Sequence, residues 1–259
     1  MIKSSIIRLT HRWLPARLRA ALFHWSFNIA PAEFKLFAYR YAYAPNMEHG
    51  LMFLRDSGFS PSRIVDIGAF KGDWSRLAKN VWPESHVIMI EPQCERIDEL
   101  LSVAKELGAV VHNELLGAVD NSTVEFTVMG SGSSIFAERS NLPRGTETRT
   151  LRTLDNLLGV NKHIDFLKID AEGYELEILR GGLQCLKNTD VVLLEVSLIA
   201  TNTGAPLIHD VLAFMVSNGF AMYDILEFHR RPLDRALNKI DIIFVRAKSN
   251  FRSNQSHSS

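Results

Sequence analysis

The chain has 259 residues, of which 46% are hydrophobic and 22% charged, and its 29 lysines and arginines balance 29 aspartates and glutamates. This length and composition suit an ordinary globular protein with one large α/β domain or two small ones. The zero net charge gives no overall attraction to nucleic acid, and no apolar run reaches the roughly 18 residues of a transmembrane helix. The two cysteines, Cys94 and Cys185, have no disulfide-framework or metal-ligand spacing, so we expect a reduced, cytoplasmic setting.

Residues 1–32 contain five lysines or arginines, no acidic residue, and many apolar residues between the basic ones. Three interpretations remain open: a helical cap, a basic amphipathic helix in peripheral contact with a membrane, and a targeting peptide. We therefore treat residues 1–45 as a basic, aromatic helical extension. Asn46 is expected to cap the helix that follows it, at residues 47–57.

From Pro61 onward the pattern alternates between short apolar strands and amphipathic helices. Strands are expected at residues 64–67, 86–90, 110–112, 165–170, 191–196, 220–226 and 241–245. Continuous apolar strands of this kind suit a parallel sheet that is covered by helices on both faces. The main domain so defined spans residues 46–246, and the Ser/Asn-rich residues 247–259 are expected to be disordered.

Two helices and one interruption complete the predicted elements. Helical spacing places Leu101 on the apolar face of the helix that ends at Gly108. It also predicts a single helix after Gly173, with Leu183 on its apolar face. Residues 115–155 interrupt the alternation with a polar β-insertion, including a strand at 150–154 and a Gly/Ser-rich loop able to cover a site.

Four predicted strands end on or near an acidic residue: Asp66, Glu91, Asp170 and Glu195. Because ligands of open α/β sheets bind at the carboxyl ends of the strands, we expect these carboxylates at one binding edge. Glu91 follows Gly68 by 23 residues (91 − 68), close to the roughly 20 residues typical of an acid that binds both ribose hydroxyls. The sequence therefore predicts a ligand that contains adenosine.

The glycine turn after the first strand argues against a dinucleotide. A G-x-G-x-x-G motif that starts at Gly68 would need glycines where Phe70 and Asp73 stand, so an NAD-dependent nucleotide-sugar oxidoreductase is the lesser alternative. Asp66 should instead lie near a positively charged ligand tail, and Asp66→Ala should weaken ligand binding more than folding. S-adenosylmethionine, an adenosine with a sulfonium and an amino-acid tail, satisfies both expectations.

Several motifs resemble the FkbM family of S-adenosylmethionine-dependent methyltransferases. They are, in order, VDIGAFKGDWS, IEP, TLDNLL, DFLKIDAEGYELEILRGG and VVLLEVS. The resemblance covers roughly residues 60–245. It implies a Rossmann-like class I methyltransferase fold, with a seven-stranded, mostly parallel sheet, helices on both faces and one antiparallel strand. It also implies O-methylation of a hydroxyl on a sugar, glycan or natural product, so we expect a small-molecule or glycan acceptor. We expect no nucleic acid, because the sequence has no net positive charge and no basic stripe.

The resemblance also assigns cofactor-binding residues. They are Asp66, Gly68, Ala69 and Gly72 in the methionine-side loop, Glu91 and Pro92 at the ribose, Gly117 and Ala118 at the adenine, and Asp170 near the methyl group.

Methyl transfer to a hydroxyl needs alignment of the reactants and a proton acceptor. The candidate catalytic residues are Asp170, Glu172, Glu195 and His209, with His112 and His229 as further histidines. A second mechanism, Mg²⁺ held by Asp170 and Glu195, is not favoured, so no metal is expected. A non-catalytic or membrane-attached binding module with the same fold remains the third alternative, because residues 1–32 are basic.

Overall fold

The computed structural model describes residues 18, 45–128, 135 and 145–253. The chain divides into two units, Met1–His49 and Gly50–Ser259, and the strands that the structure describes all belong to the second unit. The predictions for residues 1–44 and for most of the Gly/Ser-rich loop lie outside the described residues. Within the described part of the chain, no helix is both long and apolar enough to span a bilayer.

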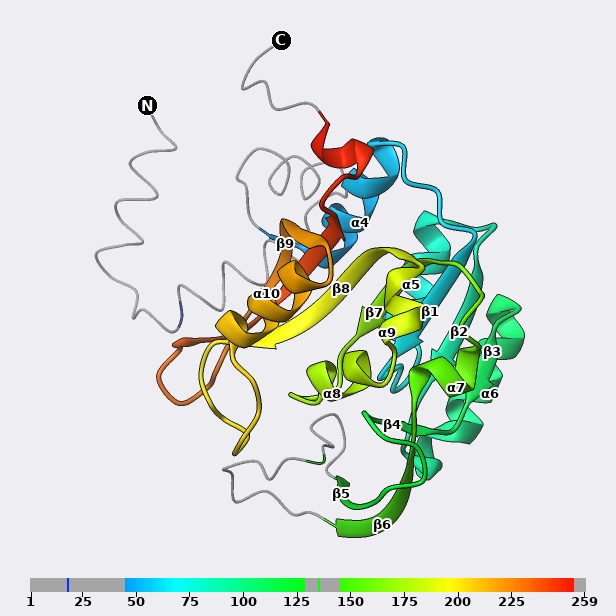
Figure 1. Ribbon diagram of the computed structural model, residues 1–259, viewed down its shortest axis with the longest axis vertical. Helices are drawn as coiled ribbons and strands as arrows, with labels where there is room; N and C mark the ends of the chain where they lie inside the picture. Colours follow the sequence, from blue (N-terminus) through cyan, green and yellow to red (C-terminus); the bar gives the residue numbers. More distant parts are fainter. Residues whose placement is uncertain (1–17, 19–44, 129–134, 136–144, 254–259) are drawn as a thin grey trace. The chain divides into compact units, whose positions relative to one another are not determined.

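The main sheet has seven strands in the order β3-β2-β1-β7-β8-β10-β9 (Figure 1). Their bounds are β1 Arg63–Ile67, β2 His86–Ile90, β3 Val110–His112, β7 Ile164–Ile169, β8 Thr189–Ser197, β9 Phe220–Arg230 and β10 Leu237–Arg246. Neighbouring strands from β3 to β8 are parallel, whereas β10 lies antiparallel between β8 and β9. The Rossmann-like α/β prediction with one antiparallel strand is confirmed.

Helices cover both faces of this sheet, with α9 and α10 on one face and α5 on the other (Figure 1). The helices are α4 Met47–Asp56, α5 Asp73–Val81, α6 Ile97–Leu107, α7 Leu154–Leu158, α8 Glu175–Arg180, α9 Leu183–Lys187 and α10 Ile208–Ser217. The apolar runs of β1, β7 and β8 are buried between these layers, as parallel strands require. Asn46 caps α4 as predicted, because its Oδ1 accepts the His49 N–H at 3.1 Å.

The helical faces depart from the sequence prediction at two leucines. Leu101 of α6 is 50% exposed, while Val103 is buried beside Leu100. Leu183 is exposed because the predicted single helix is broken into α8 and α9 at Gly181 and Gly182. A Cβ at Gly181 would lie 2.0 Å from the carbonyl oxygen of Gly117, so glycine allows the two backbones to approach there.

The β-insertion forms a second sheet, in the order β4-β6-β5, from Leu115–Leu116, Gly145–Arg152 and Thr123–Val128. The strand predicted at 150–154 begins earlier and ends earlier, because Thr153 caps α7 by accepting the Asn156 N–H on its Oγ1 at 3.2 Å. At the other end of the domain, the tail predicted to be disordered begins with a short 3₁₀ helix, Asn250–Arg252. Its Phe251 packs edge-on against Phe59, with ring centroids 5.9 Å apart.

Candidate active site

A pocket lies at the carboxyl ends of β1, β2, β7 and β8. Three of the four strand-end acids line it, namely Glu91, Asp170 and Glu195, and Glu172 joins them. Its remaining wall is largely apolar and includes residues of β2, β4 and β5. The pocket thus combines an apolar wall with a few converging carboxylates, as a small-molecule site requires.

The glycine turn after β1 packs tightly against the end of β7. Gly68 has a φ of 75°, and a Cβ there would lie 1.8 Å from the carbonyl oxygen of Asp170. The Gly68 N–H donates to the Ile90 carbonyl at 2.9 Å, and the Asp170 N–H donates to the Ile67 carbonyl at 3.1 Å. Only glycine satisfies both the left-handed backbone and the close approach, so this turn brings the ends of β1, β2 and β7 together.

Glu91 is held by the backbone on both sides. Its Oε2 accepts the Phe70 N–H at 2.8 Å, and its Oε1 accepts the Gln93 N–H at 3.0 Å. Burial raises the pKa of this carboxyl, although the two N–H donors act in the opposite direction. Each oxygen keeps acceptor capacity toward the pocket, because a carboxylate oxygen can accept two hydrogen bonds.

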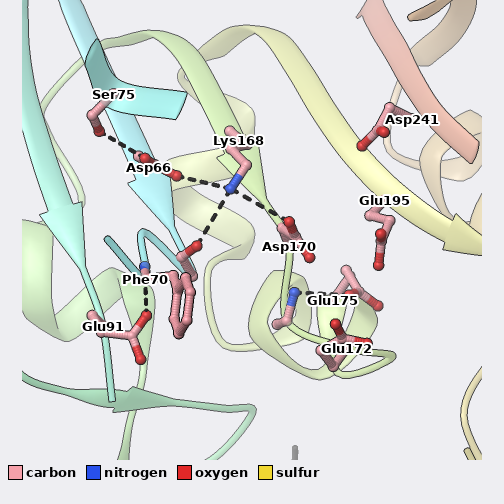
Figure 2. Close-up of polar contacts among 12 residues, drawn as sticks. Asp66, Phe70, Ser75, Glu91, Lys168, Asp170, Glu172, Glu175, Glu195 and Asp241 are labelled. Atoms are coloured by element: carbon pink, nitrogen blue, oxygen red, sulfur yellow. Dashed lines mark hydrogen bonds and ion pairs between the residues drawn. The ribbon is translucent and has the colours of Figure 1, made fainter. Parts of the chain in front are cut away.

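Asp66 does not face the pocket, which corrects its predicted contact with a ligand. Its carboxylate is fully buried and accepts hydrogen bonds from Ser75 Oγ at 2.7 Å and Lys168 Nζ at 3.0 Å (Figure 2). Lys168 also lies 3.7 Å from Asp170 Oδ2. Sequence reasoning missed this lysine, although a charged residue inside the apolar strand FLKI was the available signal.

Asp170, Glu172 and Glu195 form a carboxylate cluster in which one oxygen from each lies within 4.8 Å of the others. Lys239, at the start of β10, hydrogen-bonds to Glu172 Oε2, and its Nζ lies 2.6 Å from Glu195 Oε2. Burial, followed by repulsion from Asp170, raises the pKa of Glu195 well above its ordinary value, and Lys239 counters this effect. A carboxylate with a raised pKa is a stronger base than an exposed one.

The model of the methyltransferase FkbM domain matches residues 66–222, which is more than half of the chain. This chain belongs to the FkbM methyltransferase family. The match begins within β1 and ends within β9, so it includes the four strand-end acids but not Lys239.

Solved structures of several methyltransferases are similar to this chain. A methyltransferase FkbM from Methylobacillus flagellatus is 16% identical with a TM-score of 0.46, over 70% of this chain and 43% of its own. A magnesium protoporphyrin IX methyltransferase from Synechocystis is 11% identical with a TM-score of 0.48, over 77% of each chain. This chain therefore spans less than half the length of that FkbM protein. No curated protein matches the sequence.

The loop between β7 and α8 is held by hydrogen bonds to a buried carboxylate at the start of α8. Glu175 is buried, and its Oε1 accepts the N–H groups of Ala171 at 2.9 Å and Gly173 at 3.0 Å. Burial raises the pKa of Glu175 to about 7. From the other side, Asn202 Nδ2 donates to the Glu172 carbonyl at 2.7 Å. Sequence reasoning missed Glu175 because it lies beyond the strand end, inside a helix.

Several of the predicted site residues lie elsewhere in the chain. His209 is 73% exposed on α10 and pairs with Asp210, so the structure does not bring it to the described pocket wall. Pro92 lines the pocket, whereas Ala69, Gly72, Gly117 and Ala118 are not among its lining residues. His229 lies on β9, three strands from β7, where it bonds to Asp241 at 2.6 Å, and this contact raises the pKa of His229. His112 does not line the described pocket either.

Proposed function

We propose that this FkbM methyltransferase binds S-adenosylmethionine and transfers its methyl group to a hydroxyl of a sugar, glycan or natural product. The observation that carries the proposal is the position of Glu91, a buried carboxylate at the end of β2 that lines the pocket and is aimed by two backbone N–H groups. An acid at this point of a Rossmann-like sheet is suited to bind the two ribose hydroxyls.

The apolar wall fits an adenine ring. Leu115 and Leu116 of β4, Phe126 of β5 and Ile178 of α8 line the pocket, and Ile135 joins them. A planar heterocycle packs well between such aliphatic and aromatic side chains. The β-insertion therefore supplies the adenine side of the pocket, where the resemblance had assigned Gly117 and Ala118.

Asp170 is the acid proposed to bind the ammonium group of the methionine end. It lines the pocket beside Gly68, whereas the carboxylate of Asp66 is buried behind the turn. An opposite charge within about 4–6 Å stabilises an ammonium group. Asp66 then acts indirectly: it hydrogen-bonds to Lys168, and Lys168 lies near Asp170.

When bound, S-adenosylmethionine supplies an electrophilic methyl group, so the protein mainly has to align the acceptor oxygen and accept its proton. Glu195 is the proposed general base, because burial and the neighbouring Asp170 raise its pKa and it lines the pocket. The cluster of carboxylates also accepts hydrogen bonds from a polyhydroxylated acceptor. An anionic acceptor, such as nucleic acid, would be repelled by it.

Calorimetric titration tests the first half of this proposal. S-adenosylmethionine and S-adenosylhomocysteine should both bind with a Kd below about 100 μM, whereas NAD should not bind. A lack of heat with either adenosine ligand at that concentration would contradict the proposal. The second half is tested by following S-adenosylhomocysteine release against sugars, glycolipids and hydroxylated natural products, with polynucleotides as the comparison class.

A further inference from the structure

The carboxylate cluster of Asp170, Glu172 and Glu195 has the composition of a divalent-cation site. Three acids from the end of β7, the β7–α8 loop and the end of β8 each offer one oxygen within 4.8 Å of the others. Mg²⁺ and Mn²⁺ prefer such hard oxygen ligands. A metal ion could bind here only if no cation of the chain already occupies these carboxylate oxygens.

A cation of the chain itself already bonds to two of the three acids of the cluster. Lys239 Nζ hydrogen-bonds to Glu172 Oε2 and lies 2.6 Å from Glu195 Oε2, with the three side chains only 14%, 22% and 11% exposed. Two of the three N–H donors of the ammonium group are thus bonded to carboxylates. Attraction to these two acids outweighs burial and raises the pKa of Lys239, so the group is charged at neutral pH.

The remaining acid, Asp170, lies near a second lysine, which it shares with Asp66. Asp170 Oδ2 lies 3.7 Å from Lys168 Nζ (Figure 2). The two ammonium groups, of Lys168 and Lys239, thus lie beside all three acids of the cluster, although Lys168 also pairs with Asp66 at 3.0 Å. A dication that takes the Glu172 and Glu195 oxygens bonded to Lys239 would displace the lysine, and an unpaired buried ammonium group is strongly destabilising.

The topology of the sheet explains how a lysine so far along the chain reaches this place. β10 runs antiparallel beside β8, so β10 starts where β8 ends, and Lys239 lies opposite Ser197 in the register. A side chain at the start of β10 therefore lies over the carboxyl edge of the parallel strands. Only an antiparallel strand inserted next to β8 places its first residues there.

We propose that the Lys239 ammonium group is the resident cation of this carboxylate cluster, and that it orients Glu172 and Glu195 in the position that a divalent metal ion would otherwise take. Lys239 is thus a positioning residue, and the site works without a metal. This inference deepens the proposed function. It rests on that function only for the effect of Lys239 on turnover, because metal binding is measured without any reaction.

The test is a titration with Mn²⁺ alone, followed by the electron paramagnetic resonance signal of the free ion. The wild-type protein should show no Mn²⁺ site tighter than about 1 mM at the cluster. Lys239→Met removes the ammonium group and should create one such site, at least about tenfold tighter, which Glu195→Gln in the same chain should abolish. Lys248→Met, at an exposed lysine after β10, is the matched control and should create none.

Two outcomes would overturn the proposal. One is a Mn²⁺ site in the wild-type protein that disappears in Glu195→Gln, because the metal would then displace the lysine. The other is a folded Lys239→Met protein with no gain of Mn²⁺ affinity, because the cluster would then not be a cation position. If a thermal melt shows that Lys239→Met does not fold, Lys239→Gln, which also removes the charge, takes its place in the titration. A failure of S-adenosylmethionine to bind would leave these Mn²⁺ results unaffected and so is distinguishable.

Discussion

Lys168 of β7 and Asp66 of β1 form a buried ion pair, with Lys168 Nζ 3.0 Å from Asp66 Oδ1 and the side chains 7% and 0% exposed. The two residues are direct partners in the register of β1 and β7, so the backbone itself holds them side by side. The same ammonium group lies 3.4 Å from the Gly68 carbonyl oxygen and 3.7 Å from Asp170 Oδ2. One lysine therefore joins the glycine turn to the end of β7.

Lys168→Met should destabilise the protein by about 3–5 kcal/mol, because it leaves the Asp66 carboxylate buried without its cation. The free energy of unfolding in urea measures this loss. Arg76→Met breaks an exposed pair, with Glu106, and should cost no more than about 1 kcal/mol. Similar losses for the two variants would show that the buried pair has no special role. Lys168→Met combined with Asp66→Leu should recover much of the stability.

Gly68→Ala should be far more disruptive than Gly108→Ala. Both glycines have left-handed backbones, with φ of 75° and 63°, so both variants carry a strain of about 1–3 kcal/mol. At Gly68 the new Cβ would also meet the Asp170 carbonyl oxygen at 1.8 Å, whereas nothing lies within 4 Å of a Cβ at Gly108. Unfolding and S-adenosylmethionine titration should show an additional loss of stability and affinity for Gly68→Ala only. Equal behaviour would contradict the close approach.

Glu91→Gln should weaken S-adenosylmethionine binding about 10- to 100-fold, because hydrogen bonds to a charged acceptor contribute about 1.5–3 kcal/mol. The substitution keeps the shape of the side chain, but its single oxygen can accept only one of the Phe70 and Gln93 N–H groups, so the loss includes this backbone contact. Glu106→Gln, at an exposed glutamate of α6, is the control and should leave the Kd unchanged. An unaltered Kd for Glu91→Gln would remove the ribose assignment.

Glu175→Gln should flatten the dependence of stability on pH. The folded protein raises the pKa of Glu175 from 4.5 to about 7, so it binds more protons than the unfolded chain between these values. Glu175 therefore contributes a decrease in the free energy of unfolding as the pH rises from about 5 to 7. Glutamine can still accept the Ala171 and Gly173 N–H groups on its Oε1, so the variant should be the more stable protein at pH 8.

Urea unfolding at pH 5, 6, 7 and 8 measures this difference. Glu106→Gln, on the exposed face, should keep the wild-type slope. Other buried carboxyls, including Glu91 and Glu195, also have raised pKa values, so the slope should decrease without vanishing. A slope equal to that of the wild-type protein would show that Glu175 does not titrate in this range.

Much of the fold could be predicted because its signals are local. Apolar runs predicted the seven strands, and the motif around Gly68 predicted the turn that brings the ends of three strands together. The errors arose where packing decides. Leu101 fits an apolar helical face by spacing, yet α6 buries Val103 instead. The helix expected through Leu183 breaks because Gly181 must pass within contact of the Gly117 backbone.

The acids show the same division between sequence and structure. The sequence by itself determined the family, the order of the elements and the presence of an acid at each of four strand ends, since periodicity and motif spacing lie along the chain. Only the tertiary structure decided that Glu91 lines the pocket while Asp66 is buried against Lys168. Likewise, Lys239 reaches Glu195 across 44 residues of sequence. Such pairings depend on strand register and on the antiparallel insertion of β10, and neither is encoded in any local stretch of residues.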